Sequence, residues 1–119
     1  MPEKRILLVE DDPDTQHVLG LVLQAEGYAV DRASAFADAM EHLRARPYGL
    51  AIVDWRIPGG DGLEVADAAA DLGSKTILVS GYLLQMPAGR AERHETLMKP
   101  IRPSEIVNAA ARALGECRD

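Results

Sequence analysis

Polar residues follow four short apolar runs of this sequence, and their types suit the chemistry of phosphoryl transfer. They are Glu10, Asp11, Asp54, Ser80 and Lys99. Neighbouring carboxylates repel one another unless a cation neutralises them, and an oxygen-only set without nearby His or Cys favours a hard metal ion. Mg²⁺ suits such a set best, because it binds one or two carboxylates together with water molecules and a phosphate.

A carboxylate held beside Mg²⁺ can act as a nucleophile toward phosphorus and form an acyl phosphate. The metal ion screens the approach of the anionic donor and stabilises charge on the equatorial oxygens of the transferring group. A lysine and a hydroxyl can hold two more phosphoryl oxygens. These side chains together therefore predict phosphoryl transfer to an aspartate.

The polar side chains meet only if the apolar runs are parallel strands of one sheet. The sequence predicts strands at 6–9, 28–31, 50–53, 76–79 and 95–98, with the second of them at an edge. Helical spacing of apolar residues predicts helices at 13–26, 34–46, 63–72 and 104–114, and a short or interrupted helix at most within 82–93. This alternation indicates a parallel α/β sheet covered by helices on both faces. The C-terminal ends of its strands share one edge, where ligands bind.

Local signals mark the ends of several elements. Pro13 suits the first turn of a helix, and Gly27 suits the end of the same helix. Ser34 is expected to cap the second helix, and residues 58–62 form a loop by composition. Asp12 is interpreted as a helix cap or a surface residue.

Size and charge exclude several classes of protein. A chain of 119 residues fits one domain, 1–119, and 47% hydrophobic residues suffice for a core without disulfides. A formal net charge of −6 argues against nucleic-acid binding, which needs a basic face. The lone cysteine, Cys117, is interpreted as a surface thiol and requires no oxidising compartment. No run approaches the ~20 apolar residues of a membrane span, and no signal peptide is present, so a cytoplasmic protein is expected.

Four motifs together resemble the receiver domain of response regulators in two-component signalling. They extend over nearly the whole chain, in the order and close to the spacing of that family. The motifs are the segments 6–13 (ILLVEDDP), 52–62 (IVDWRIPGGDG), 79–81 (VSG) and 98–100 (MKP). The resemblance implies a flavodoxin-like (βα)5 fold, which is a doubly wound five-stranded parallel sheet with strand order 2-1-3-4-5 and helices on both faces.

The resemblance also implies how the acidic residues bind a metal ion. Asp54 is the expected phosphoacceptor. Asp11, Asp54 and the backbone carbonyl of Arg56 are the expected ligands of Mg²⁺, or of Mn²⁺ in its place. Glu10 is expected to act through a metal-bound water.

The remaining motif residues are implied to bind the phosphoryl group. Ser80 is expected to bond one phosphoryl oxygen and to reorient on phosphorylation. Lys99 is expected to form an ion pair with the phosphoryl group, and Pro100 to follow it in a cis peptide bond. Phosphoryl transfer and autodephosphorylation are then self-catalysed, and the protein is not expected to be a metabolic enzyme.

The family takes its phosphoryl group from a phosphohistidine. A sensor histidine kinase or a histidine phosphotransfer protein is therefore the expected donor, and an unidentified downstream protein is the expected target. The domain itself is expected to bind neither nucleic acid nor membrane, and to be a monomer or a phosphorylation-dependent dimer. The early first strand favours a complete single-domain protein or an N-terminal receiver domain.

The sequence departs from the family pattern in three places. Thr96 stands where the family commonly has an aromatic switch residue, three residues before Lys99. The stretch between Ser80 and Lys99 is short for the family and carries a proline and a glycine. Arg56 and Tyr82 are large at two positions that border the path of the hydrolytic water, which predicts a long-lived acyl phosphate.

Two other functions remain open at this point. The first is a degenerate receiver that binds a partner without being phosphorylated, for which the missing aromatic at Thr96 is the argument. The second is a phosphatase with an aspartyl nucleophile on a related α/β fold. Such hydrolases typically carry a second acid two residues after the nucleophile, where this chain has Arg56.

No role in the chemistry is assigned to the tryptophan or to the three histidines. Trp55 is expected to pack against the core or to make a partly exposed contact. His17, His42 and His94 are scattered along the sequence and are interpreted as surface residues.

Overall fold

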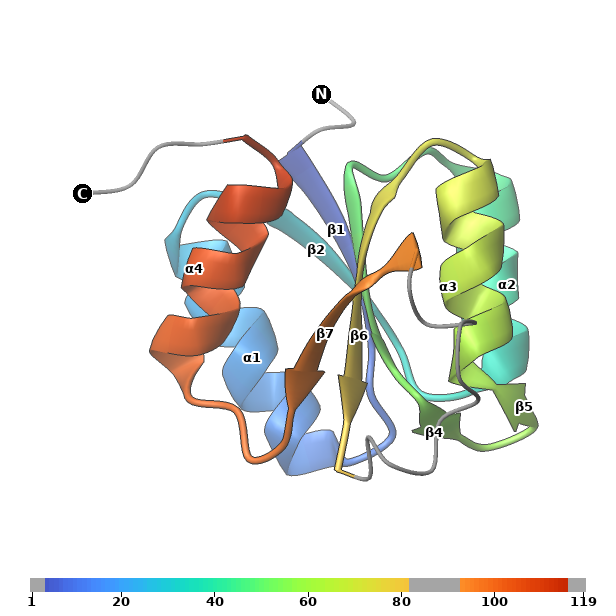
Figure 1. Ribbon diagram of the computed structural model, residues 1–119, viewed down its shortest axis with the longest axis horizontal. Coiled ribbons are helices and arrows are strands. Elements are labelled where there is room, and N and C mark those ends of the chain that lie inside the picture. The colour runs from blue at the N-terminus through green and yellow to red at the C-terminus, as the bar shows by residue number, and fades with distance from the viewer. Residues whose placement is uncertain (1–3, 82–92, 116–119) are drawn as a thin grey trace.

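The computed structural model describes residues 4–81 and 93–115, which form a five-stranded parallel sheet between two layers of helices (Figure 1). The strands of the sheet are β1 (Arg5–Val9), β2 (Ala29–Ala33), β3 (Leu50–Asp54), β6 (Lys75–Ser80) and β7 (Glu95–Met98). The helices are α1 (Pro13–Ala25), α2 (Phe36–Ala45), α3 (Gly62–Asp71) and α4 (Pro103–Ala113). Helices α1 and α4 cover one face of the sheet, and α2 and α3 cover the other.

The strand order along the sheet is β2-β1-β3-β6-β7. For the five parallel strands taken in chain order this is 2-1-3-4-5, so the predicted doubly wound topology is confirmed. The second strand lies at an edge, as predicted. Because the strand order reverses beside β1, the C-terminal ends of β1 and β3 border the position where ligands bind in such sheets.

The central strands are held by side chains buried on both faces. Leu8, Ile52 and Ile77 lie side by side on β1, β3 and β6, and each is at most 1% exposed. They face α1 and α4, whereas Leu7 and Val53 pack toward α2 and α3. Burying each such side chain stabilises the fold by about 1.5–3 kcal/mol. This core fixes the strand ends that carry the polar residues.

Helix α1 begins as the sequence predicts. The Asp12 side chain accepts a hydrogen bond from the Thr15 backbone N–H at 2.9 Å, and Pro13 occupies the first turn. Asp12 is therefore a helix cap. Gly27, with φ of 98°, follows the helix in a conformation that favours glycine.

Helix α2 begins one residue later than the predicted Ser34 cap. Its N-cap residue is Ala35, and the carboxylate of Asp38 accepts hydrogen bonds from the backbone N–H groups of Ser34 and Ala35 at 3.0 and 2.9 Å. The prediction was wrong because Ser34 lies one residue before the N-cap position, and the first helical N–H, that of Phe36, donates to the Pro58 carbonyl at 2.9 Å instead of to the serine hydroxyl. The Asp38 carboxylate holds the backbone that precedes the helix.

Residues 58–62, predicted as a loop, contain part of a short hairpin. Strands β4 (Arg56–Ile57) and β5 (Gly60–Asp61) pair antiparallel, and Gly59 turns between them with φ of 84°. The Asp61 side chain then accepts from the Leu63 backbone N–H at 2.9 Å and caps α3. The first strand of the hairpin therefore begins two residues after Asp54, the last residue of β3.

The predicted short helix within 82–93 lies outside the described residues except for its last position. Tyr82 and Cys117 lie outside them as well. Over the described part of the chain, no helix combines the length and the apolar character needed to cross a membrane.

Candidate functional site

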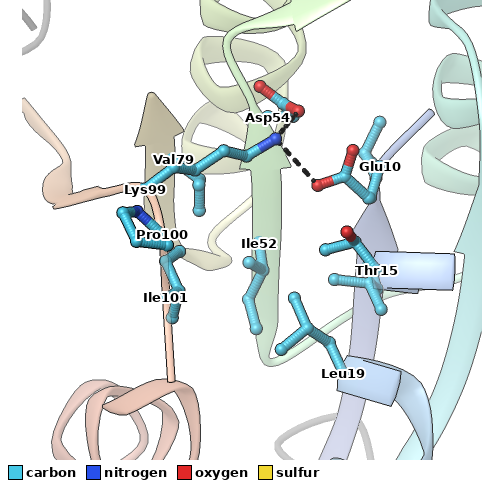
Figure 2. Close-up of a pocket in the computed structure, with 11 residues that line it drawn as sticks. Glu10, Thr15, Leu19, Ile52, Asp54, Val79, Lys99, Pro100 and Ile101 are labelled. Atoms are coloured by element: carbon cyan, nitrogen blue, oxygen red, sulfur yellow. Dashed lines mark hydrogen bonds and ion pairs between the residues drawn. The ribbon is translucent and has the colours of Figure 1, made fainter. Parts of the chain in front are cut away.

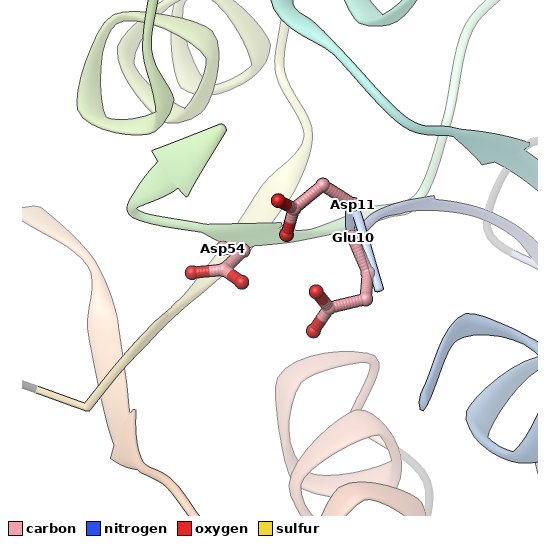
Figure 3. Close-up of side chains that lie close together, drawn as sticks. All are labelled: Glu10, Asp11 and Asp54. Carbon is pink, nitrogen blue, oxygen red and sulfur yellow. The ribbon is translucent and has the colours of Figure 1, made fainter. Parts of the chain in front are cut away.

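The five predicted polar residues meet at the C-terminal edge of the sheet. Asp54 is the last residue of β3 and Ser80 the last of β6, while Glu10 and Asp11 follow β1 and Lys99 follows β7. Figure 3 shows the carboxylates of Glu10, Asp11 and Asp54 converging on one point. Each offers an oxygen that lies within 4.8 Å of the others. The expected acidic cluster is therefore present.

Lys99 spans the gap between two of these carboxylates (Figure 2). Its Nζ donates to Asp54 Oδ2 at 2.6 Å and lies 3.1 Å from Glu10 Oε1. Burial acts to lower the pKa of Lys99, but the ion pairs with Asp54 and Glu10 outweigh it and raise that pKa. The ammonium group is therefore charged and positioned beside Asp54, 45 residues away in the sequence.

The backbone also fixes the surroundings of Asp54. The Arg56 backbone N–H donates to Asp54 Oδ1 at 3.2 Å, and the Lys99 N–H donates to the Ser80 carbonyl at 2.9 Å. Asp54 is 6% exposed. The Lys99–Pro100 peptide bond is cis, as predicted.

The donor set fits a hard divalent cation. A cavity of about 390 Å³ lies at the acidic edge, lined by Asp11, Asp54, Arg56, Ser80, Gly81 and Lys99. When all three carboxylates are ionised, they leave two negative charges against the one ammonium, which one divalent ion neutralises. Oxygen ligands alone suit Mg²⁺, and the cavity leaves room for its water molecules and a phosphate.

Glu10 is the carboxylate that burial perturbs most clearly. Burial raises the pKa of Glu10 to about 7, the charge of Asp54 adds to the rise, and the Asp12 N–H and Lys99 act against it. In the absence of a metal ion, Glu10 therefore binds a proton near neutral pH. A metal ion must compete with that proton.

We expect Mg²⁺ to stabilise the protein more at about pH 8 than at about pH 6. Because the folded-state pKa of Glu10 lies above its value in the unfolded chain, stability from this group is lost as pH rises through about 7. Mg²⁺ restores it by neutralising the ionised carboxylate. Thermal unfolding with and without Mg²⁺ at both pH values measures the effect. In Glu10→Gln, the rise in melting temperature caused by Mg²⁺ should depend less on pH than in the wild type. A pH dependence equal to that of the wild type would contradict the role assigned to Glu10.

Ser80 and Thr96 occupy different positions relative to this edge. Ser80 is 1% exposed and lines the same cavity as Asp54. Thr96 pairs with Leu78 on β6, so its side chain lies on the face of the sheet that α2 and α3 cover. Strand β6 therefore lies between Thr96 on β7 and the strand that ends at Asp54.

Trp55 and Arg56 follow Asp54 directly. Trp55 is partly buried and packs against the core between the sheet, α2 and α3, as expected. The Arg56 guanidinium lies over its indole ring, 5.6 Å from the centroid. Trp55 is therefore placed to report on events at Asp54.

His94 is the polar residue that the sequence interpretation placed wrongly. It is 7% exposed, not a surface residue. Its Nε2 lies 2.8 Å from Asp67 Oδ1 on α3, and its Nδ1 forms a hydrogen bond with the Thr76 hydroxyl on β6. Both partners lie 18 or more residues away in the sequence, and no local signal identifies them.

Comparison with known proteins agrees with this geometry. A family model described as the response regulator receiver domain matches residues 6–111. The response regulator receiver protein CpdR of Brucella abortus is 33% identical over 116 residues, which cover 93% of this chain and 97% of CpdR. The chain spans between 50% and 62% of three other, longer relatives.

Solved structures are similar over the same region. A CheY-like response regulator receiver domain protein of Methanospirillum hungatei has a TM-score of 0.83 and 26% identity, with 93% of each chain covered. The response regulator TrrA of Thermotoga maritima has a TM-score of 0.81 and 29% identity, with 92% of this chain and 97% of TrrA covered. That TrrA structure is a complex with Mg²⁺-BeF.

Proposed function

Because the chain belongs to the response regulator receiver domain family, we propose that it is a signalling switch that accepts a phosphoryl group on Asp54 with the help of Mg²⁺. The observation that carries the proposal is that Glu10, Asp11, Asp54 and Lys99 meet at the C-terminal edge of the sheet. A phosphohistidine of a sensor histidine kinase or a phosphotransfer protein is the proposed donor.

Asp11, Asp54 and the Arg56 carbonyl are the proposed direct ligands of the metal ion, with Glu10 acting through a water. When bound, Mg²⁺ supplies positive charge for the oxygens of the transferring group. An Asp54 carboxylate oxygen attacks phosphorus, the P–N bond of the phosphohistidine breaks, and the leaving imidazole takes up a proton. Lys99 then holds one phosphoryl oxygen and the Ser80 hydroxyl donates to another.

Phosphorylation gives Lys99 a new partner, and this is the proposed start of the switch. In the structure its ammonium pairs with Asp54 and Glu10. A phosphoryl group on Asp54 adds negative charge in the same cavity, so Lys99 and Ser80 would shift toward it. Since Thr96 cannot serve as an aromatic lever, we propose that the change reaches the surface through the segments that carry Ser80 and Lys99.

Beryllium fluoride tests the proposal without a cognate donor, because it forms an adduct with carboxylates that imitates an acyl phosphate. With Mg²⁺ present it should change the fluorescence of Trp55, which directly follows Asp54. Asp54→Asn should abolish that change. A response without Mg²⁺, or one that survives in Asp54→Asn, would contradict the assigned site.

Two alternatives make different predictions. A degenerate receiver would bind its partner equally well with and without phosphorylation. A phosphatase would turn over phosphate esters, but the second acid that those hydrolases place two residues after the nucleophile is replaced here by Arg56. We propose that the chemistry is limited to self-catalysed transfer and autodephosphorylation, in the cytoplasm, with an unidentified protein as target.

A predicted docking surface for the donor lies on α1, which begins directly after the acidic turn. Val18 and Leu21 on this helix are 46% and 49% exposed. The double substitution Val18→Ser and Leu21→Ser should slow transfer from a phosphohistidine donor by about tenfold, since buried apolar anchors contribute most of the affinity of an interface. Transfer from acetyl phosphate should stay unchanged. Leu72→Ser, at a 64% exposed leucine after α3, is the control, and it should leave the rate of transfer from either donor unchanged.

Arg56 is predicted to lengthen the lifetime of the acyl phosphate. Arg56 lines the cavity with Asp54 and its guanidinium lies over Trp55, and we propose that this side chain obstructs the approach of water. Arg56→Ala should speed hydrolysis by roughly threefold or more, while the backbone carbonyl still binds the metal ion. Loss of the phosphorylated mass over time measures the rate. An unchanged rate, with Arg44→Ala as the comparison, would rule out the shielding role.

A further inference from the structure

A turn without any proposed metal ligand touches both the acidic turn after β1 and the hairpin that begins with the proposed carbonyl ligand. This β2–α2 turn comprises residues 33–36 and connects the end of β2 to the start of α2. On one side it contacts the turn after β1, which holds Glu10 and Asp11. On the other side it contacts the β4–β5 hairpin, which begins at Arg56.

Gln16 of α1 joins the β2–α2 turn to the acidic turn. Its side-chain Nε2 lies 2.9 Å from the Glu10 carbonyl oxygen, 3.1 Å from that of Ala33 and 3.3 Å from the Ser34 hydroxyl. The Glu10 backbone N–H also donates to the Ala33 carbonyl at 3.0 Å. The main chain of Glu10 is thus held to the end of β2 directly by its N–H group and indirectly, through Gln16, by its carbonyl.

Phe36 joins the other end of the turn to the hairpin. Its backbone N–H donates to the Pro58 carbonyl at 2.9 Å, and its ring packs directly on Gly60. A Cβ at Gly60 would lie 2.5 Å from the ring carbons, so only glycine fits without a shift of the ring. Asp38 fixes the turn between these contacts through the backbone N–H groups of residues 34 and 35.

We propose that Gln16 is a positioning residue for the metal site, which acts through the β2–α2 turn to fix the separation of the two ligand-bearing segments. This inference rests on the proposed Mg²⁺ site. Mg²⁺ demands nearly ideal octahedral geometry, so its affinity depends on how well the ligands are placed before binding. Outer partners that orient metal ligands typically change affinity about 10–100-fold when removed.

The test replaces the amide of Gln16 and follows Mg²⁺ binding by Trp55 fluorescence. Gln16→Leu should raise the Kd for Mg²⁺ by about tenfold. Its phosphorylation by acetyl phosphate should be slowed at limiting Mg²⁺ and should return to within about twofold of the wild-type rate at saturating Mg²⁺. Gln24→Leu changes the same residue type at an exposed position of α1 and should leave both the Kd for Mg²⁺ and the phosphorylation rate unchanged. A purely structural role for Gln16 would lower the melting temperature without changing the Kd.

A second variant keeps the test valid if Gln16→Leu does not fold. Gly60→Ala should displace Phe36 and weaken Mg²⁺ binding in the same direction. If the wild-type protein itself binds no Mg²⁺, the proposed function fails and the inference fails with it. If the wild type binds Mg²⁺ and a folded Gln16→Leu binds it with the wild-type Kd, the positioning role alone is overturned. If Gln16→Leu does not fold, a wild-type Kd in Gly60→Ala overturns it.

Discussion

Asp11→Asn should reduce the affinity for Mg²⁺ by at least about 100-fold and nearly abolish phosphorylation by acetyl phosphate. Asp11 is the exposed member of the carboxylate cluster, so the substitution removes one ligand charge without disturbing the core. Glu10 and Asp54 remain, but each is already paired with Lys99. Titration of Trp55 fluorescence with Mg²⁺ measures the loss.

The matched control for Asp11→Asn is Asp14→Asn. Asp14 is an exposed aspartate in the first turn of α1, only three residues away, and it does not belong to the cluster. It should retain the wild-type affinity. Equal Mg²⁺ binding by Asp11→Asn and the wild type would show that the metal ion, if it binds, lies elsewhere.

Gly62→Ala should destabilise the fold by ~3 kcal/mol or more, at or beyond the upper end of overpacking effects. Gly62 begins α3, and its N–H donates to the Trp55 carbonyl at 2.9 Å. An added Cβ would collide with the backbone carbonyl of Asp54 and lie 2.8 Å from the Trp55 Cα. Because these are main-chain atoms, β3 or α3 must move, and the phosphoacceptor moves with them.

Chemical denaturation measures this loss, and a fall of ~10–20 °C in melting temperature should accompany it. Gly20→Ala is the informative comparison. The three atoms nearest to a Cβ there belong to the flexible end of the Arg32 side chain, and alanine favours a helix over glycine by up to about 1 kcal/mol. Gly20→Ala should therefore leave stability unchanged or raise it. A Gly62→Ala protein as stable as the wild type would contradict the close packing of α3 on β3.

The sequence predicts the architecture of the site because that architecture depends on strand ends. Asp54 and Lys99 are 45 residues apart, yet each stands at the C-terminal end of a strand in one parallel sheet. A chain whose buried runs stop at polar residues must bring those residues to one edge. The acidic cluster could therefore be predicted without knowledge of any side-chain contact, whereas the strand order was predicted from the resemblance to receiver domains.

Other features depend on contacts that the sequence does not encode locally. The burial of His94 follows from partners on α3 and β6, and a single histidine carries no sign of them. The start of α2 depends on a partner from another part of the chain, because the first helical N–H, that of Phe36, donates to the Pro58 carbonyl and needs no serine hydroxyl. Gln16 has three acceptors because two turns happen to meet beside it.

The most direct test of the central claim is the intact mass of the protein after incubation with acetyl phosphate and Mg²⁺. We predict a gain of one phosphoryl group in the wild type, and no gain either without Mg²⁺ or in Asp54→Asn. The acidic cluster, Lys99 and Ser80 would then act together as a phosphoacceptor site. Absence of any gain, repeated with a phosphohistidine donor protein, would contradict the account and favour a binding module that is not phosphorylated.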